Sequence, residues 1–208
     1  MKYRIWFLGL SAGLLGMGCS SGGGGGGASS GISSAASAEF VGIYQTTGYS
    51  DNSASCDAPG ASLLDGLQDK YFVVAAADEF GISTVSVVSC SGVADCQAKG
   101  SKVTDGGFYS SVYSFTLSSA VNATVLAGLY ATTGFGEGTM CTGRTYADHT
   151  LTLNSDHSLH LESRSKELAD KPQQDGFCEV EPAKSQQEAA TLPCSELTVL
   201  DGTFVQVK

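Results

Sequence analysis

Basic residues are scarce in this chain of 208 residues, which has 11 Lys and Arg against 21 Asp and Glu and a formal net charge of −10. No stretch of the sequence gathers Lys or Arg into a cluster. A protein that binds nucleic acid or another anionic surface through charge needs such a basic patch. The composition therefore argues against these partners, and its acidity is typical of a well-solvated protein surface.

Familiar catalytic motifs are also missing. No Gly-x-Ser-x-Gly occurs in residues 39–208, and the two matches at 9–13 and 27–31 lie in the apolar run and in the Gly/Ser-rich segment near the start of the chain, so the nucleophile elbow of an α/β-hydrolase is absent; there is also no repeated βαβ pattern. The segment 163–166 (SRSK) has the Ser-x-x-Lys form of penicillin-recognising enzymes, but it ends an expected strand and no Lys-Thr-Gly follows. The glycine-rich segment 134–138 lacks the Lys of a phosphate-binding loop. We therefore expect no enzyme of a familiar class, and a hydrolase with an unfamiliar site is the alternative.

The histidines offer little sign of a metal or cofactor site. No Cys-x-x-Cys pair exists, and the histidines do not stand at zinc-finger spacing from the cysteines. His157 and His160 differ by an odd number, so on one strand they would point to opposite faces. We interpret His157 as a turn residue and His160 as a solvated partner of Glu162 and Arg164. The possible ligands or bases and the acids near them are His149, His157 and His160, with Asp148 and Asp156.

The acidic residues of the first long loop do not form a calcium motif. Asp51, Asn52 and Asp57 offer oxygen ligands, but the Asp-x-Asp-x-Asp-Gly pattern of a calcium loop is missing. Asp and Asn are also typical turn residues. We therefore expect these residues to shape a turn, and the sequence predicts neither a metal nor a cofactor.

The beginning of the chain is typical of an export signal. Residues 1–4 are basic, and the apolar run 5–15 has roughly the length of a signal-peptide core, too short to span a membrane. Residues 16–19 (GMGC) then resemble the lipobox of bacterial lipoproteins, with Leu15 four residues before the cysteine. The resemblance implies removal of residues 1–18 and lipidation of Cys19 as the mature N-terminus. Secretory cleavage after Ala38 is the alternative.

The residues after Cys19 predict a flexible tether. Residues 20–38 are almost wholly Gly, Ser and Ala, and such a segment buries too little apolar area to offset its ordering entropy. Residues 19–38 would then form a lipidated, Gly/Ser-rich tether spanning roughly 24 Å. Ser20 stands where an Asp favours inner-membrane retention in known lipoprotein sorting systems, so the resemblance implies the outer membrane of a bacterial cell envelope.

Residues 39–208 are expected to form one disulfide-stapled domain, because no second low-complexity break interrupts them. An exported chain with an even number of cysteines beyond Cys19 predicts three disulfides. These six cysteines are Cys56, Cys90, Cys96, Cys141, Cys178 and Cys194.

Short runs of β-branched and aromatic residues, separated by Gly, Asp, Asn and Ser, predict a β-rich domain. The expected strands are 40–47, 70–77, 82–89, 108–118, 123–133, 143–153, 157–164 and 197–207. The last one contains Asp201-Gly202, which is compatible with either a bulged single strand or a two-residue hairpin. The sequence predicts one helix, at 182–191, where Pro182 suits the first helical position and Pro193 blocks its continuation.

Two segments echo each other, in the form Gly-x-Tyr-x-Thr-Thr-Gly-aromatic followed by a cysteine. They are 42–56 and 128–141. The echo indicates either a duplicated half-domain or two strands that are alike by chance.

Short and long connections alternate along the expected strands, as in an up-and-down antiparallel sheet. This order places every domain cysteine at the long-loop end, opposite the end where the tether enters. We therefore predict an eight-stranded antiparallel barrel, with a two-sheet β-sandwich as the alternative. Gly42-x-Tyr44 is faintly similar to the Gly-x-Trp opening of lipocalins, a resemblance that bears on shape alone.

Loop positions narrow the disulfide pairings. Two bridges would be local, one across the five-residue loop after the third strand and one around the expected helix. The third would join the equivalent cysteines of the two echoing segments. The predicted bridges are Cys90–Cys96, Cys178–Cys194 and Cys56–Cys141.

The sequence therefore predicts a non-enzymatic, lipid-anchored envelope protein. It would bind a protein or a small apolar ligand through its long-loop end or its barrel interior. A purely structural envelope component is a further alternative.

Overall fold

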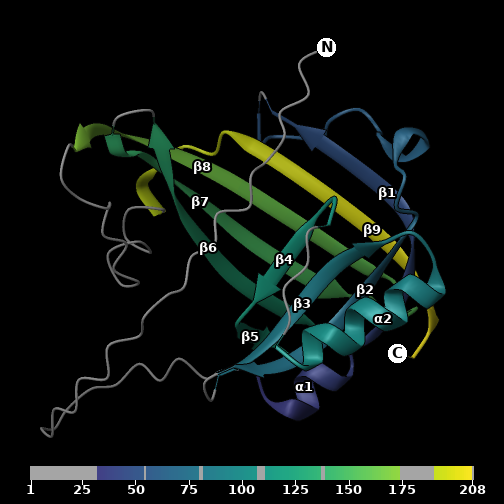
Figure 1. The fold of residues 1–208 in the computed structure, drawn as a ribbon. Helices are drawn as coiled ribbons and strands as arrows, with labels where there is room; N and C mark the ends of the chain where they lie inside the picture. Colours follow the sequence, from purple (N-terminus) through teal and green to yellow (C-terminus); the bar gives the residue numbers. More distant parts are fainter. Residues whose placement is uncertain are drawn as a thin grey trace, which may run out of the picture.

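The fold is built almost entirely from antiparallel strands (Figure 1). A computed structural model describes residues 32–53, 55–79, 82–106, 111–136, 139–173 and 190–207. The helices named in this part of the chain are α1 (Ser34–Ala38), α2 (Val93–Thr104) and the short 3-10 helix η1 (Leu64–Gly66). The strands are β1 (Gly42–Asn52), β2 (Tyr71–Glu79), β3 (Ile82–Cys90), β4 (Ser114–Leu117), β5 (Ser119–Asn122), β6 (Val125–Gly136), β7 (Thr139–Leu153), β8 (Leu159–Gln173) and β9 (Glu196–Gln206).

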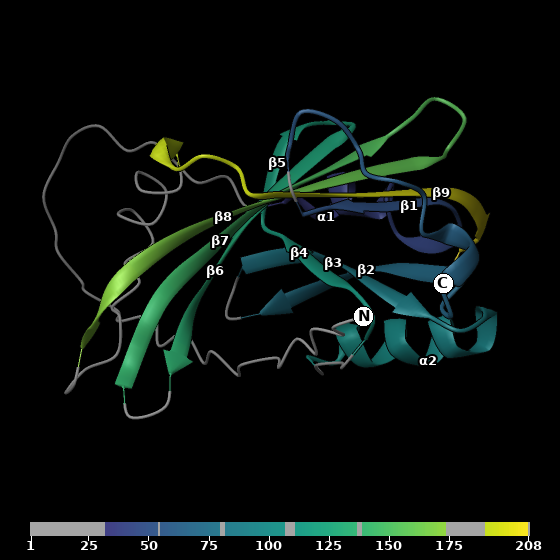
Figure 2. The same ribbon diagram turned by 90° about the horizontal axis from the view of Figure 1, so that it is seen from above.

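These strands form one sheet in the order β4-β3-β2-β1-β9-β8-β7-β6-β5. The two outermost strands, β4 and β5, are separated in sequence by Ser118 alone, so the chain passes directly from one edge of the sheet to the other. The sheet therefore wraps into a nearly closed barrel (Figure 2). This all-β barrel confirms the predicted architecture and makes the two-sheet sandwich unnecessary.

The barrel closes where β4 meets β6. Ser118 N donates a hydrogen bond to Ala127 O at 2.9 Å. A Cβ atom on Gly128 would lie 2.3 Å from the backbone oxygen of Thr116, so only glycine permits this close approach. The sequence predicts a turn at 119–122, but these residues continue from β4 as β5. The sheet therefore has nine strands instead of the predicted eight.

Apolar side chains fill the interior from Ile32 and Phe40, at the end of the barrel where β1 begins and β9 ends, to Tyr113 and Phe115. We call the end where β1 begins the N-terminal end. Tyr44 stacks on Phe72 with ring centroids 5.2 Å apart, and its hydroxyl donates to Phe40 O at 2.9 Å. The buried side chains packed in this interior cluster include Val74, Val85, Val87, Leu117, Leu126, Leu151, Leu159, Leu161 and Leu200. Close packing of these side chains provides the main stabilisation of the barrel.

The predicted tether is too long, because its last residues belong to the barrel. Ile32 is 2% exposed within the interior cluster, and Ser37 of α1 is 5% exposed. Ser33 caps α1 by accepting a hydrogen bond from Ala36 N at 3.2 Å. The predicted domain start at Glu39 is therefore wrong by at least seven residues. The reason is that Ile32, an isoleucine among Gly, Ser and Ala, packs into the barrel interior. Residues 19–31 of the predicted tether lie outside the described residues.

A second apolar core lies on the outer face of the sheet, where α2 covers β2 and β3 (Figures 1 and 2). It is formed by Ile43, Val73, Ala75, Ala77, Val88, Cys90, Cys96 and Val103. The sequence predicts a loop at 90–107, so α2 is a correction. Its 12 residues include Gly100 and β-branched residues that favour helices weakly, and packing on the sheet compensates for this weak propensity.

Two further predictions concern the end of the chain. Ala190 and Thr191 are helical, and the rest of the helix predicted at 182–191 lies outside the described residues. Asp201 and Gly202 lie within the continuous strand β9, so the hairpin alternative is wrong. The irregularity lies on β1, where the register shifts between Thr46 and Gly48 opposite these two residues. The two echoing segments form β1 and β6, and the question of a duplicated half-domain stays open.

The Cys56–Cys194 disulfide lies at the end of the barrel where β1 ends and β9 begins, which we call the disulfide end. Cys90–Cys96 joins β3 to α2 as predicted, with 5.3 Å between the Cα atoms. Cys56 pairs with Cys194 at 5.9 Å, so the predicted bridges Cys56–Cys141 and Cys178–Cys194 are wrong. The physical reason is the pairing of β1 with β9, which brings the end of the first strand beside the start of the last. Cys178 lies outside the described residues.

Candidate functional site

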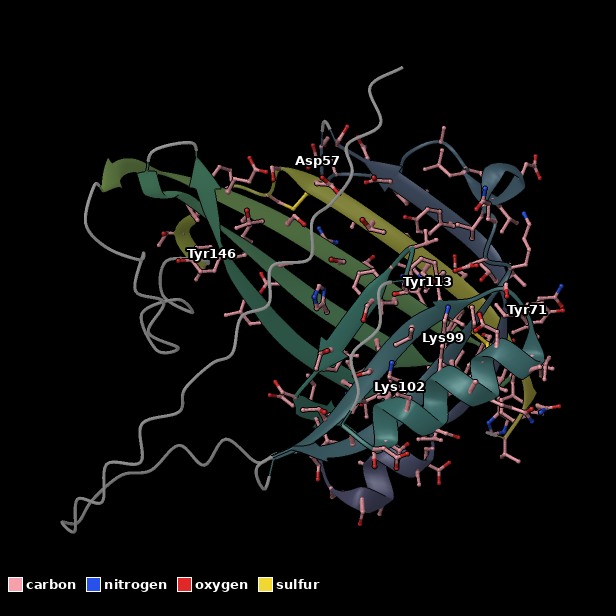
Figure 3. All side chains as sticks on the ribbon, in the orientation of Figure 1. Asp57, Tyr71, Lys99, Lys102, Tyr113 and Tyr146 are labelled. Carbon is pink, nitrogen blue, oxygen red and sulfur yellow. A yellow bond between two sulfur atoms is a disulfide. The ribbon has the colours of Figure 1, made fainter. Side chains whose placement is uncertain are left out.

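The candidate site is a layer of polar and aromatic side chains on the inner face of the barrel, toward the disulfide end. It borders the apolar interior cluster, to which Tyr113 and Phe115 also belong, and it draws on β1, β4 with the residue before it, β7 and β8. Tyr113 is labelled in Figure 3. We call this site the inner polar layer. Its members are Thr46, Tyr49, Tyr113, Phe115, His149 and Ser163.

Aromatic rings run in a row across this layer. The rings of Tyr49 and Tyr113 stack with centroids 5.6 Å apart, and Tyr113 stacks on Phe115 at 5.9 Å. Phe115 meets the imidazole of His149 edge-on at 5.1 Å. Such offset and edge-on pairs add to the stability gained from burial. The row joins β1 to β7 and gives the interior a continuous aromatic surface.

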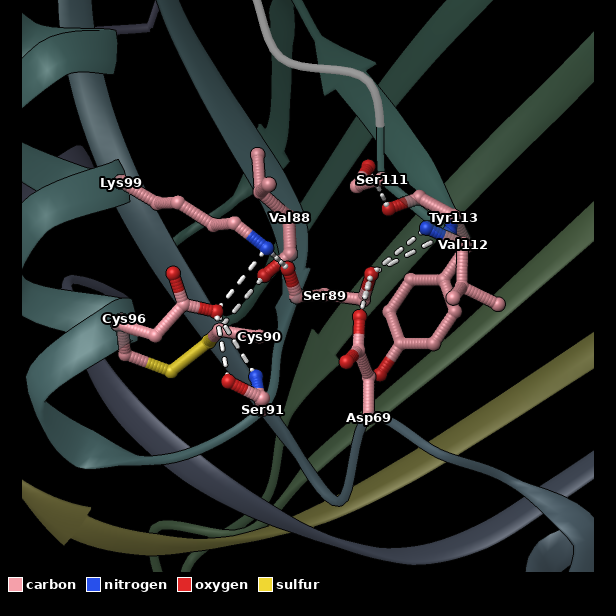
Figure 4. A network of polar contacts seen from close by, with 11 residues as sticks. Asp69, Val88, Ser89, Cys90, Ser91, Cys96, Lys99, Ser111, Val112 and Tyr113 are labelled. Atoms are coloured by element: carbon pink, nitrogen blue, oxygen red, sulfur yellow. Dashed lines mark hydrogen bonds and ion pairs between the residues drawn. A yellow bond between two sulfur atoms is a disulfide. The ribbon is translucent and has the colours of Figure 1, made fainter.

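A buried serine holds Tyr113 in place. Ser89 Oγ donates to Asp69 Oδ2 at 2.9 Å and accepts from the backbone N–H groups of Val112 and Tyr113 at 3.0 and 3.4 Å (Figure 4). The Tyr113 hydroxyl lies 3.3 Å from Thr46 Oγ1. Burial raises the pKa of Tyr113, so the hydroxyl stays protonated at neutral pH.

The same serine connects the layer to α2. Lys99 Nζ donates to Ser89 O at 2.8 Å and pairs with the Asp95 carboxylate at 3.1 Å (Figure 4). Asp95 in turn accepts from the N–H and hydroxyl groups of Ser91 just before the helix. These contacts and the Cys90–Cys96 bridge fix the end of β3, which carries Ser89.

His149 and Ser163 form a cross-strand pair, with 3.0 Å between His149 Nδ1 and Ser163 Oγ. Burial lowers the pKa of His149 to about 4, although the nearby Asp148 acts in the opposite direction. The imidazole is therefore neutral at physiological pH.

The pair does not form a catalytic triad. Ser163 is only 4% exposed and His149 only 5%. Side chains alternate along β7, so Asp148 points away from His149 and forms an ion pair with Lys166 at 2.7 Å. Without an orienting carboxylate or access for a substrate, the pair acts as a satisfied polar contact of the interior.

Two carboxyl groups lie beside Tyr49. Burial raises the pKa of Asp51, while a hydrogen bond with Glu196 acts to lower it. Burial and the charges of Asp51 and Glu196 raise the pKa of Tyr49. Asp51 is therefore a strand residue next to the aromatic row instead of the predicted turn residue.

Asn52 is the last residue of β1, and its side chain and that of Asp57 shape the turn that follows. Asn52 donates to Ala58 O at 2.9 Å and accepts from Ser55 N at 3.2 Å. Asp57 accepts from the Ser55 hydroxyl at 3.1 Å. These local bonds shape the turn after β1.

The outer face of β8 carries the remaining histidine contacts. His160 lies 3.5 Å from Glu162, which accepts from Arg164 at 2.9 Å, so their predicted association is confirmed. The sequence did not indicate the closest partner, Asp201, at 2.6 Å from His160 Nδ1. His157 has a φ of 61° in the β7–β8 turn, which confirms it as a turn residue. The described residues contain no group of three His, Cys, Asp or Glu arranged to hold a metal ion.

The segment 163–166 lies within β8, so its Ser-x-x-Lys sequence is on a strand as expected. Residues 134–136 of the glycine-rich segment belong to β6, and the next two lie outside the described residues.

No helix in the part of the chain that the structure describes is long and apolar enough to cross a membrane. Comparisons with models of protein families, with curated proteins and with solved structures found no match to this chain.

Proposed function

We propose that this protein is a non-enzymatic, lipid-anchored protein of the bacterial envelope that binds a small, largely apolar ligand at the disulfide end of its barrel. The observation that carries the proposal is the aromatic row from Tyr49 to Phe115 beside a tightly packed interior. Stacked rings offer a flat apolar surface, of which the Tyr49 ring is partly exposed, and the carboxyl groups of Asp51 and Glu196 lie beside that ring. A ligand with a ring and few polar groups fits this combination.

The packing of the N-terminal segment supports an anchor at Cys19. Secretory cleavage after Ala38 would remove Ile32 and α1, whose residues pack into the barrel. A mature chain that starts at Cys19 keeps them. Because α1 precedes the start of β1 and the Cys56–Cys194 disulfide follows its end, an anchored protein would present the inner polar layer away from the membrane. Ser20 supports the outer membrane as the location.

A hydrolase is less well supported than a binding protein. Among the residues that the structure describes, the nearest approach to a nucleophile and base is Ser163 with His149, and both side chains are almost fully buried. The lowered pKa of His149 also makes it a weak base at neutral pH.

A fluorescence titration tests ligand binding. The only Trp, Trp6, lies in the proposed signal peptide, so the mature chain has no Trp background. We expect the oxidised chain from residue 19, with Cys19→Ser, to bind the neutral apolar fluorophore N-phenyl-1-naphthylamine with a saturable rise in emission. Tyr49→Ala removes one stacking surface and should weaken binding by about two- to tenfold.

The matched control is Phe204→Ala, which removes a half-exposed ring at the N-terminal end. It should leave the affinity unchanged. Absence of saturable binding, or an equal loss from both variants, would contradict the proposed site.

Mass spectrometry of the membrane fraction tests the anchor. We expect acyl mass on Cys19, and Cys19→Ser should remove it. An unmodified N-terminus at Glu39 would overturn this part of the proposal.

A further inference from the structure

Four of the six large apolar side chains that are exposed in the described residues lie at the N-terminal end of the barrel. Phe204, Val205 and Val207 are 39%, 41% and 72% exposed at the end of the chain. Val121 of β5 is 63% exposed, and β5 runs toward the same end because Val125 pairs with Thr152 near the end of β7. Exposed apolar residues that share one end of a molecule indicate an interaction surface.

A shallow groove lies at the same end. It has a volume of about 440 Å³ and is open to solvent. Most of its lining comes from aliphatic and other small side chains of α1, the approach to β1, β2 and the C-terminal residues. The lining residues are Ser34, Ser37, Ala38, Val41, Ala76 and Val207.

The chain itself indicates what covers this surface. Packing of Ile32 shortens the tether from Cys19 to residues 20–31, twelve residues of Gly, Ser and Ala. A flexible chain of this composition spans about 19 Å on average. The tether reaches the barrel at α1, directly beside the groove. A lipid on Cys19 would therefore hold this apolar end close to the bilayer at a high effective concentration.

We infer that the N-terminal end of the barrel is a membrane-docking surface. This inference rests on the proposed lipidation of Cys19. The boundary between headgroups and acyl chains is contacted by Val205, Val207 and the groove beside α1. The N-terminal end of the barrel therefore faces the membrane, and the disulfide end points away from it. The exposed carboxylates of Glu39 and Asp156 stay at headgroup level. They favour zwitterionic over anionic lipids, because like charges repel.

Single tryptophans at the two ends test the orientation. Val207→Trp places a reporter on the docking surface, and Leu63→Trp is the matched control, since Leu63 is 46% exposed at the disulfide end. Each lipidated chain, with its acyl mass verified, is reconstituted into phosphatidylcholine vesicles that contain brominated lipid. We expect emission from the Val207→Trp variant to shift to the blue and to be strongly quenched, and emission from the Leu63→Trp variant to remain unchanged.

The outcomes separate this inference from the anchor. An acylated chain whose Val207→Trp reporter is not quenched would overturn docking and leave the anchor intact. Equal quenching of both reporters would overturn the proposed orientation. A mature chain without acyl mass on Cys19 would overturn the anchor and the docking together.

Discussion

The two halves of the barrel interior differ in chemistry, although the same strands build both. On β1, Tyr44 is 1% exposed, stacked on Phe72 and bonded to the backbone of Phe40. Five residues later, Tyr49 is partly exposed and lies beside two carboxyl groups. The comparison shows that the half around Tyr44 stabilises the barrel by close packing. The half around Tyr49 contains polar groups that do not contribute to such packing. The predictions below test this division.

The largest expected effect on the free energy of unfolding comes from removing the disulfides. Cys56–Cys194 closes a loop of 138 residues and Cys90–Cys96 one of 6. Chain entropy alone predicts a loss of about 5 kcal/mol for the first bridge and about 2 kcal/mol for the second. Urea unfolding of the two double Cys→Ala variants measures both losses, and a larger loss for the local bridge would contradict this order.

Non-reducing peptide mapping checks the pairing itself. The Cys56 peptide should be linked to Cys194. The two domain cysteines left over, Cys141 and Cys178, should be linked to each other. A link from Cys56 to Cys141 would contradict the account.

Leu161 and Ser163 allow a matched comparison on one strand and one face. Both are buried, Leu161 in the apolar half and Ser163 in the inner polar layer. Leu161→Ala should cost about 2 to 5 kcal/mol through lost packing and a cavity. Ser163→Ala should cost about 1 to 2 kcal/mol, because it removes the hydrogen-bond partner of His149. Equal losses in unfolding free energy would contradict the division.

Acid should weaken the inner polar layer through His149. Its pKa is lowered to about 4 in the folded protein, while an unfolded His titrates near 6.5. Between these values the unfolded chain binds a proton and the folded chain does not. Stability is therefore full above about pH 6.5 and falls toward pH 4, by up to about 3 kcal/mol.

The control variant for this pH dependence is His149→Gln, which keeps a polar group beside Ser163. Its unfolding free energy should lose this part of the pH slope between 6.5 and 4. An unchanged slope would show that other groups cause the acid sensitivity.

The smallest effect is expected outside the barrel, at His160. Burial lowers the pKa of His160, but the hydrogen bonds and charges of Asp201 and Glu162 together raise it by more, so the net pKa is raised. Its stabilisation is present at low pH and is lost as the pH rises through the raised pKa. Asp201→Asn should lower the His160 pKa in an NMR titration and change stability by less than about 1 kcal/mol, because the pair is exposed. An unchanged pKa would argue against the contact.

Strand positions were predictable because each strand carries its own pattern. Tyr113, Phe115 and Leu117 point inward and alternate with polar residues, as the sequence indicates. Helix α2 was not predictable in the same way, since its Gly and Thr content disfavours a helix and its stability comes from contacts with the sheet. The Cys56–Cys194 bridge could have been found, because a closed barrel makes the first and last strands neighbours.

The inner polar layer was harder to predict, because it depends on strand register. The predicted turn of three residues, 154–156, would place His149 opposite Leu161. The observed turn has five residues, 154–158, with His157 at positive φ. The longer turn shifts the register by two residues and places His149 opposite Ser163. No local sequence signal fixes that length.

Ring resonances of the tyrosines test the division of the interior most directly. We would label the tyrosine rings of the chain from residue 19, assign Tyr44, Tyr49 and Tyr113 by substitution to Phe, and titrate with N-phenyl-1-naphthylamine. The account predicts saturable shifts for Tyr49 and Tyr113 and none for Tyr44. A shift confined to Tyr44, or no shift of any of the three rings, would contradict it.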